Sequence, residues 1–429
     1  MGTPPPEHGL RLDPYDPDFQ QSPFPTYARL RREAPVFPVP GHGWYAVTRM
    51  DLVRAALRDP VTYANSGVAG RRSEPPPEVA DEVAALRARG HPYRPALGLS
   101  DPPAHTRYRR LVNRAFTPRA LAWMEPLVES AARELAAGLP DGQVVDVVAA
   151  VTRPLPVWAI LRILGLSDDR RADVARWSDA ATASLGARLD AQRWLEVERD
   201  VLDFQLAMAA ELDQRRARPR EDLLSTLVAP VEDGEPLGNG ELVWLVRELL
   251  VAGNETTART LAEILLRLGG DPGTWQRIRR DPAWVARVVE EGLRLSSPAM
   301  GMFRRVTRDT ELGGVRLPEG ATVFLVYGSA NRDESVFPDA DSFDADRANA
   351  REHVAFGHGL HVCVGAGLAR LEAAAALRAL ADHVDELSVV DPAALAYLPS
   401  FFLRGLTSLP VTVRRRAATA APPAAGPAT

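Results

Sequence analysis

The chain has 429 residues, a net charge of −5 and 51 basic residues, all of them arginine. This mild acidity gives no reason to expect nucleic acid as a partner. Residues 1–20 are rich in proline and acidic side chains and contain no apolar run, so we expect neither a signal peptide nor a membrane anchor. A single cysteine rules out a disulfide within the chain, which fits a reducing compartment and predicts a cytoplasmic protein.

The sequence predicts one domain. No internal stretch of low complexity separates two halves of different composition. We expect a flexible segment over residues 1–12, a single domain over residues 13–415, and a disordered tail rich in alanine and proline over residues 416–429.

The first hundred residues predict short elements joined by irregular segments. Residues 36–48 alternate turn residues with Val, Phe, Trp and Tyr, which predicts a hairpin around their glycines. A short amphipathic helix is expected over residues 51–58. Residues 66–100 are predicted to be irregular, with a helical turn over residues 82–89.

Helical periodicity dominates the rest of the chain. The longest pattern, residues 241–268, corresponds to about 40 Å of helix at ~1.5 Å per residue, and turn residues bound it at both ends. The other helices are expected over residues 106–115, 118–137, 157–164, 170–185, 191–216, 284–295 and 366–380. Short strands are expected around residues 310–326 and 401–413. The sequence therefore predicts a mainly α protein with a small β part.

The only cysteine lies in a glycine-rich loop, just before the predicted helix 366–380. The run is Phe356-Gly-His-Gly-Leu-His-Val-Cys363-Val-Gly365. Its glycines allow the backbone to pass close to a flat ligand, and backbone N–H groups can then point at the sulfur. The helix that follows presents its N-terminus to a thiolate and stabilises the negative charge there.

Two alternatives compete with a role for Cys363 as a thiolate ligand. A lone cysteine is commonly a buried and inert side chain. The second alternative is zinc, because His353, His358 and His361 crowd the same stretch. Structural zinc sites use paired ligands at fixed spacings, however, and the sequence contains no second pair.

Taken whole, the run resembles the haem-binding loop of the cytochrome P450 superfamily, F-G-x-G-x-H-x-C-x-G. The resemblance implies that Cys363 is the thiolate ligand of the iron of haem b, and that Phe356, Gly357, His361 and Gly365 bind the haem. It also implies the cytochrome P450 fold, with the haem between the long central helix and the cysteine loop. The full pattern is far more specific than its parts, so it outweighs the inert and zinc alternatives.

A second motif lies in the middle of the longest predicted helix. The run Ala252-Gly-Asn-Glu255-Thr256 places a glycine and polar residues in an otherwise apolar helix, which simple packing does not explain. A threonine within a helix can bond back to the carbonyl one turn earlier and bend the helix. The run also matches the oxygen-activation signature of the resembled family. That match implies that Thr256 steadies bound oxygen, Glu255 helps to deliver protons and Ala252 contacts the haem.

Haem carries two propionates, which require cations or hydrogen-bond donors. His105 and Arg109 are four residues apart and share one face of a predicted helix. By the resemblance, these two residues bind the propionates together with Arg304 and His361. Arg305 is adjacent to Arg304 and competes with it for this assignment.

Glu291 and Arg294 form a Glu-x-x-Arg pair within the predicted helix 284–295, and Arg347 follows downstream. A pair of this kind is usually an exposed salt bridge that contributes a few tenths of a kcal/mol. In the resembled family the equivalent three residues interlock below the haem. We therefore expect a structural triad, which is costly to break singly because a buried charge is then left unpaired.

Together, the motifs predict a haem-thiolate monooxygenase that uses O₂ to oxidise a small metabolite, most simply by hydroxylation. Electrons are expected from a ferredoxin or flavodoxin with its NAD(P)H-dependent reductase, because the chain has no cysteine cluster for an iron–sulfur module and no room for a flavin module. Arg110, Arg114 and Arg351 are candidates for the surface that this acidic partner binds. Secondary metabolism is the expected setting.

The substrate is expected to be hydrophobic or amphiphilic, because the segments that vary in the resembled family are mostly apolar here. These segments are residues 66–99, 177–207, 249–252, 299–303 and 400–403. Aryl coupling, ring formation and nitration on the same haem fold remain alternatives to hydroxylation. A peroxide-driven enzyme or a haem protein without turnover is disfavoured, because Glu255, Thr256 and Cys363 are all present.

Overall fold

The computed structural model describes residues 10–68, 74–229, 237–269 and 271–417. Of the two terminal segments expected to be flexible or disordered, residues 1–9 and 418–429 lie outside the described residues. Leu10 and Leu12, at the start of the described chain, are buried in an apolar cluster with residues of the first two strands.

Most of the described residues are helical, as the sequence predicts. The α-helices are α1 (Pro17–Gln21), α2 (Phe24–Glu33), α3 (Met50–Arg58), α4 (Ala80–Ala88), α5 (Ala104–Asn113), α6 (Pro118–Ala137), α7 (Pro154–Leu164), α8 (Arg171–Thr182), α9 (Ala191–Ala217), α10 (Leu223–Val228), α11 (Asn239–Leu268), α12 (Pro272–Arg280), α13 (Trp284–Ser296), α14 (Tyr327–Ala330) and α15 (Ala366–His383).

The strands are short and form a minor part of the fold. They are β1 (Val36–Val39), β2 (Trp44–Val47), β3 (Tyr63–Ala64), β4 (Val144–Asp146), β5 (Met302–Val306), β6 (Thr310–Leu312), β7 (Val315–Leu317), β8 (Thr322–Leu325), β9 (Val384–Val389) and β10 (Pro410–Arg415). The largest sheet has the order β1-β2-β8-β5-β3, and only β2 and β8 run parallel in it. A second sheet has the order β4-β10-β9, and β6 pairs with β7.

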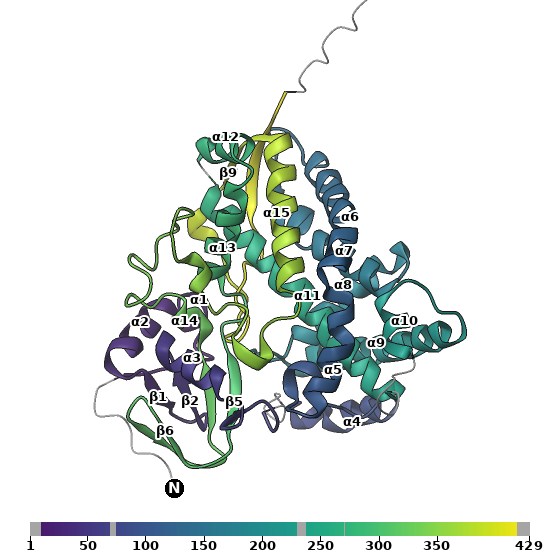
Figure 1. Cartoon of the computed structure of the whole chain (residues 1–429), viewed down its shortest axis with the longest axis vertical. Helices are drawn as coiled ribbons and strands as arrows, with labels where there is room; N and C mark the ends of the chain where they lie inside the picture. The colour runs from purple at the N-terminus through teal and green to yellow at the C-terminus, as the bar shows by residue number, and fades with distance from the viewer. Residues whose placement is uncertain (1–9, 69–73, 230–236, 270, 418–429) are drawn as a thin grey trace, which may run out of the picture.

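Helix α11 passes through the centre of the molecule, with α7, α8, α9, α13 and α15 packed around it (Figure 1). Helix α15 lies along α6, and the sheet that contains β1, β2 and β5 lies on the other side of the molecule with α2 and α3 (Figure 1). The main apolar core surrounds α11, and its central side chains include Leu245, Val246, Leu261 and Ile264. This core fixes α11 against α15, the helix that follows Cys363.

The helix ends follow local chemistry that can be read in the sequence. Helix α6 begins after Thr117, whose Oγ1 accepts the N–H of Ala120 at 3.2 Å, and Pro118 occupies the first turn. At the start of α11, the carboxylate of Glu241 accepts the N–H of Gly238 at 3.1 Å. These contacts satisfy backbone donors that a helix leaves free at its N-terminus.

The sequence predicted the long helices to within a few residues, but it missed several short elements. Helices α2 and α12 were not expected, and neither was strand β5. The strand expected over residues 401–413 is found only at Pro410–Arg415, because residues 401–409 form bends and isolated bridges instead. The bend expected at Thr256 does not interrupt α11, which is α-helical from Asn239 to Leu268.

Candidate functional site

The loop before α15 holds Cys363 in a compact turn. The N–H of Cys363 donates to the carbonyl of Phe356 at 2.9 Å, which closes the loop on itself. Gly357 and Gly359 have φ values of 69° and 71°, in the left-handed region that favours glycine. A Cβ atom on Gly359 would lie 2.8 Å from the carbonyl oxygen of Leu57 in α3. The two glycines are therefore required by the backbone and by the close approach of α3.

The sulfur of Cys363 lies where backbone and side-chain charges favour a thiolate. Although Cys363 is accessible to solvent, the protein atoms packed around its sulfur raise the pKa of the thiol. Four groups oppose this rise: the N–H groups of Gly365 and Ala366 and the guanidinium groups of Arg109 and Arg370. Both N–H groups belong to the start of α15, where the helix dipole also favours negative charge. These are the donors that the sequence predicted for a thiolate ligand.

Two histidines and two arginines from α5, β5 and the loop itself lie close together here. The ring of His105, in α5, lies 4.2 Å from the ring of His361 in the loop, centroid to centroid. Arg109, one turn after His105, donates to the carbonyl of Val362 at 2.6 Å. In β5, Arg304 is buried, and its charge reaches His361.

The structure also decides between the two adjacent arginines of β5. Successive side chains of a strand point to opposite faces, so only one of them can face the site. Arg304 is buried, whereas Arg305 is exposed and its side chain lies against Gly67. Of the two arginines, Arg304 is therefore the one that lies beside His361, and its contact with a propionate stays a prediction.

The two histidine rings are held neutral, and three of their four nitrogens lack a hydrogen-bond partner among the described residues. Burial, together with His105, Arg304 and Arg109, lowers the pKa of His361 to about 3, and burial lowers the pKa of His105. Both ring nitrogens of His105 and Nε2 of His361 are buried without a hydrogen-bond partner among the described residues. Asp101 lies 4.0 Å from His361 Nε2, beyond hydrogen-bonding distance. Unpaired polar atoms of this kind are costly to bury and indicate that they bind a ligand.

The motif Ala252–Thr256 of α11 lies where this otherwise buried helix reaches solvent. Ala252 is exposed, although α11 is buried over most of its length, and Val362 and Cys363 in the loop are exposed as well. The hydroxyl of Thr256 donates to the carbonyl of Ala252 at 2.7 Å, as the sequence predicted. Glu255 points to a different partner, the guanidinium of Arg259 one turn later.

Comparisons with known proteins agree on one family. The sequence model of cytochrome P450 matches residues 192–383. Cytochrome P450 107B1 of Saccharopolyspora erythraea is 36% identical over 405 residues, which cover 92% of this chain and 96% of that protein. The 6-deoxyerythronolide B hydroxylase of the same organism is 36% identical over 396 residues, which cover 90% and 95%. The solved structure of cytochrome P450 CYP109Q5 from Chondromyces apiculatus gives a TM-score of 0.83 at 35% identity, covering 95% of this chain and 100% of that one.

The chain belongs to the cytochrome P450 family. It is therefore a monooxygenase with a haem-iron cofactor, as the motifs predicted. The residues at the site fit this cofactor. Cys363 offers a sulfur that backbone N–H groups face, and His105, Arg109, Arg304 and His361 offer donors for carboxylates. No helix among the described residues is both long and apolar enough to cross a membrane.

The three histidines that raised the zinc alternative do not act together in this P450. His353 Nε2 lies 3.2 Å from the carboxylate of Glu290, and His358 Nε2 lies 3.4 Å from Nε of Arg58. His361 contacts His105 instead. No set of three His, Cys, Asp or Glu side chains within the described ranges could hold a metal ion. The zinc alternative was therefore wrong.

Glu372 is a functional candidate that the sequence analysis missed. It lies on α15 and is buried, and the hydroxyl of Thr257, next to Thr256 on α11, hydrogen-bonds to its carboxyl group. Burial raises the pKa of Glu372 to about 8, and its Oε2 atom has no partner among the described residues. A signal was available in the sequence, because Glu372 occupies an apolar position between Leu368 and Ala376.

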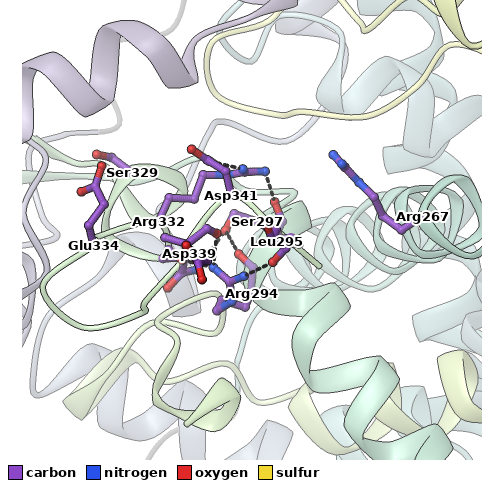
Figure 2. Close-up of polar contacts among 12 residues, drawn as sticks. Arg267, Arg294, Leu295, Ser297, Ser329, Arg332, Glu334, Asp339 and Asp341 are labelled. Carbon is purple, nitrogen blue, oxygen red and sulfur yellow. Dashed lines mark hydrogen bonds and ion pairs between the residues drawn. The ribbon is translucent and has the colours of Figure 1, made fainter. Parts of the chain in front are cut away.

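The expected triad is present below the site. Arg294 donates to both carboxylate oxygens of Glu291, at 2.8 Å and 2.7 Å, and Arg347 donates to one of them at 3.1 Å. The side chains of Glu291 and Arg294 are fully buried. Figure 2 shows Arg294 next to Arg332, another buried arginine, which donates to the carbonyl of Leu295 and to Asp341. Arginine side chains thus tie the segment after α14 to the end of α13.

Glu255 lines a cavity of about 360 Å³ on the side of α11 that carries Arg259. Side chains from residues 182–193, which run from the end of α8 to the start of α9, and from residues 398–407 line this cavity. Two of the segments expected to contact substrate, residues 177–207 and 400–403, therefore meet there. Of the segment 66–99, residues 69–73 lie outside the described residues.

Proposed function

We propose that Cys363 ligates the iron of haem b and that the protein hydroxylates a hydrophobic or amphiphilic metabolite. The observation that carries this proposal is the position of the Cys363 sulfur at the start of α15, where the N–H groups of Gly365 and Ala366 face it. A thiolate-ligated haem activates dioxygen, so that one oxygen atom enters the substrate and the other leaves as water. Binding of the cofactor and delivery of protons are assigned to side chains of this protein.

His105, Arg109, Arg304 and His361 are assigned to the two propionates. The neutral rings of His105 and His361 donate N–H groups, and the two guanidinium groups supply the positive charge. Phe356, Gly357 and Gly365 shape the loop, and Ala252 of α11 would contact the haem. These groups come from α5, β5, α11 and the cysteine loop, so the folded chain as a whole positions the cofactor.

Thr256 and Glu255 are assigned to oxygen activation. The hydroxyl of Thr256 donates to the carbonyl of Ala252, so its oxygen remains free to accept a hydrogen bond from a water molecule. Glu255 borders the cavity beside α11 and can take protons from water there. To pass a proton toward Thr256, the Glu255 carboxylate must leave its contact with Arg259.

A ferredoxin or flavodoxin, reduced by an NAD(P)H-dependent reductase, is the proposed electron donor in the cytoplasm. The three arginines expected at its docking surface, Arg110, Arg114 and Arg351, are all exposed. Secondary metabolism is the proposed setting, because one relative is a 6-deoxyerythronolide B hydroxylase. Aryl coupling, ring formation and nitration differ from hydroxylation in their products, so product analysis distinguishes them.

The experiment that tests the cofactor assignment is a ferrous–carbonyl difference spectrum of the purified, haem-supplied protein. We expect the red-shifted band of a thiolate-ligated haem, and we expect Cys363→Ser to abolish it while a folded protein remains. An Arg218→Gln variant, altered at an exposed residue after α9, serves as the control that keeps the band. A Cys363→Ser protein with the unchanged band would overturn the assignment of the ligand.

A further inference from the structure

The cavity beside α11 has mainly apolar walls with an excess of positive charge. Four arginines line it, but only two carboxylates, Asp179 and Glu255. The apolar part of the wall includes Leu185, Leu189 and Leu403. The four arginines are Arg153, Arg188, Arg193 and Arg259. A volume of about 360 Å³ lies within the range of sites that bind small organic ligands.

Three of these four arginines are already paired with carboxylates. Arg153 donates to Asp179, and Arg259 donates to Glu255. Arg193 donates to Glu196 at 3.1 Å on the same helix. The charge of these three groups is therefore largely compensated, and the excess belongs to Arg188.

Arg188 is held by an aromatic ring instead of a carboxylate. Its guanidinium carbon lies 4.5 Å from the ring centroid of Tyr15, and Tyr15 packs edge-on against Phe401. No described carboxylate forms an ion pair with Arg188, and Asp13, beside Tyr15, faces His42 at 3.6 Å. A guanidinium stacked on a ring keeps its N–H groups free in its own plane. Arg188 is an exposed residue that the ring positions, and its donors are available for a ligand.

The loop that carries Arg188 is fastened to the opposite wall of the cavity. The hydroxyl of Ser400 donates to the carbonyl of Leu185 at 2.6 Å, and the N–H of Phe401 donates to the carbonyl of Gly186 at 3.2 Å. Gly186 has a φ of 69°, and a Cβ atom there would lie 2.7 Å from Cβ of Phe402. A loop that is held before a ligand arrives loses little entropy when the ligand binds.

We propose that this cavity binds the carboxylate of an anionic amphiphilic substrate, and that Arg188 is the residue that recognises it. A planar guanidinium can donate two parallel N–H bonds to a carboxylate, while the leucine side chains of the wall cover the apolar part. Of the motif that contains Thr256, Glu255 is the residue that lines this wall. The inference rests on the proposed function, since it names the class of substrate for that site.

The test compares three probes of equal chain length on the haem-loaded protein: dodecanoate, 1-dodecanol and dodecyltrimethylammonium. Isothermal calorimetry gives the dissociation constants, and the absorbance spectrum of the same samples reports the haem spin state. We expect dodecanoate to bind about tenfold tighter than the alcohol, because one charge-assisted contact differs between them. The cationic probe is expected to bind more weakly than the alcohol. Equal binding of dodecanoate and dodecanol would overturn the proposal.

Variants then assign the preference to one residue. We expect Arg188→Gln to reduce the preference for dodecanoate over dodecanol about tenfold and Arg188→Lys to retain part of it, because lysine keeps the charge but not the planar pair of donors. Arg218→Gln removes the same charge from the far end of α9 and is expected to keep the full preference. An Arg188→Gln protein that retains the preference would overturn the role of Arg188. If the variant does not fold, the comparison of probes on the unaltered protein still decides.

The ferrous–carbonyl spectrum separates this inference from the proposed function. A missing thiolate band with a retained preference for dodecanoate would contradict the cofactor assignment alone. A normal band with no preference for dodecanoate would contradict the substrate class alone.

Discussion

The guanidinium of Arg294 and the carboxylate of Glu291 form two hydrogen bonds, of 2.8 Å and 2.7 Å, at a place from which solvent is excluded. The two residues are three apart on α13. Most ion pairs at this spacing on a helix are exposed and contribute little to stability. Here Arg294 also donates to the carbonyls of Asn331 and Ala340, at 2.8 Å and 2.7 Å. One buried ion pair therefore anchors the end of α13 to the segment after α14.

Replacing Glu291 by Gln is expected to destabilise the protein by about 3–5 kcal/mol, because it leaves the charges of Arg294 and Arg347 buried without a counter-ion. Urea unfolding followed by circular dichroism measures the change. Glu129→Gln, which removes a partly exposed carboxylate paired with Arg133, is the matched control and is expected to cost less than about 1 kcal/mol. Equal stabilities of the two variants would show that the buried triad contributes no more to the stability of the protein than an exposed ion pair does.

Much of the site could be predicted because its signals are local in the sequence. The glycines around Cys363 are needed by a backbone with positive φ, and that need is visible in the residue types themselves. The back-bond of Thr256 follows from its position within a helix. The long helices were predicted for the same reason, since their apolar periodicity is a property of consecutive residues.

What the sequence did not reveal depends on packing between distant segments. Glu372 occupies an apolar position of its helix, but its contact with Thr257 depends on the packing of α15 against α11. Strand β5 is recognisable mainly by its partners β3 and β8, so the choice between Arg304 and Arg305 could not be made before the sheet was known. Helix α12 is short and begins at Pro272, close after the end of α11 at Leu268, so the sequence pattern did not show it as a separate helix.

Thr256→Ala is expected to retain haem but to divert electrons from product to hydrogen peroxide. The reason is that the variant lacks the hydroxyl that the carbonyl of Ala252 holds in place. The measurement is product and peroxide formed per NAD(P)H oxidised, with a surrogate ferredoxin and reductase. Thr256→Ser keeps a hydroxyl and is expected to lie closer to the unaltered protein. An unchanged yield of product from Thr256→Ala would remove Thr256 from its proposed role.

Glu290→Gln is expected to raise the midpoint reduction potential of the haem. Burial would raise the pKa of Glu290, but His353 and Arg370 outweigh this effect and hold the pKa at about 2, so the carboxylate is charged. Arg370 in turn lies over the ring of Phe356, with its guanidinium carbon 4.7 Å from the centroid, and its charge reaches Cys363. Without the negative charge of Glu290, the positive charge of Arg370 is no longer compensated. It then stabilises the reduced haem, which carries one more negative charge than the oxidised haem.

A spectroelectrochemical titration of the haem-loaded protein measures this potential. Glu129→Gln also removes one carboxylate charge, at a partly exposed position, and is expected to leave the potential unchanged. If Glu290→Gln and Glu129→Gln gave the same potential, the charge of Arg370 would not reach the iron.

Glu372 is expected to make the stability of the protein fall with pH between about 5 and 8. Burial raises the pKa of Glu372 to about 8, against 4.5 for an ordinary glutamate, so the folded chain keeps a proton that the unfolded chain releases over this interval. Because the folded state then binds more protons, the free energy of unfolding decreases as the pH rises. The contribution is complete below pH 4.5 and is lost as the pH passes 8. Its size is on the order of a few kcal/mol.

Glu372→Gln removes this dependence, because glutamine stays neutral and can keep the hydrogen bond to Thr257. Urea unfolding of the variant and of the unaltered protein at pH 5 and pH 8 gives the difference in stability at each pH, in which the titration of all other groups cancels. The difference is expected to shift in favour of the variant by a few kcal/mol from pH 5 to pH 8. Glu372→Ala leaves a cavity, which lowers the free energy of unfolding by the same amount at both pH values. A difference that is the same at pH 5 and pH 8 would mean that Glu372 ionises at its ordinary pKa and that α11 and α15 bury a carboxylate beside Thr257.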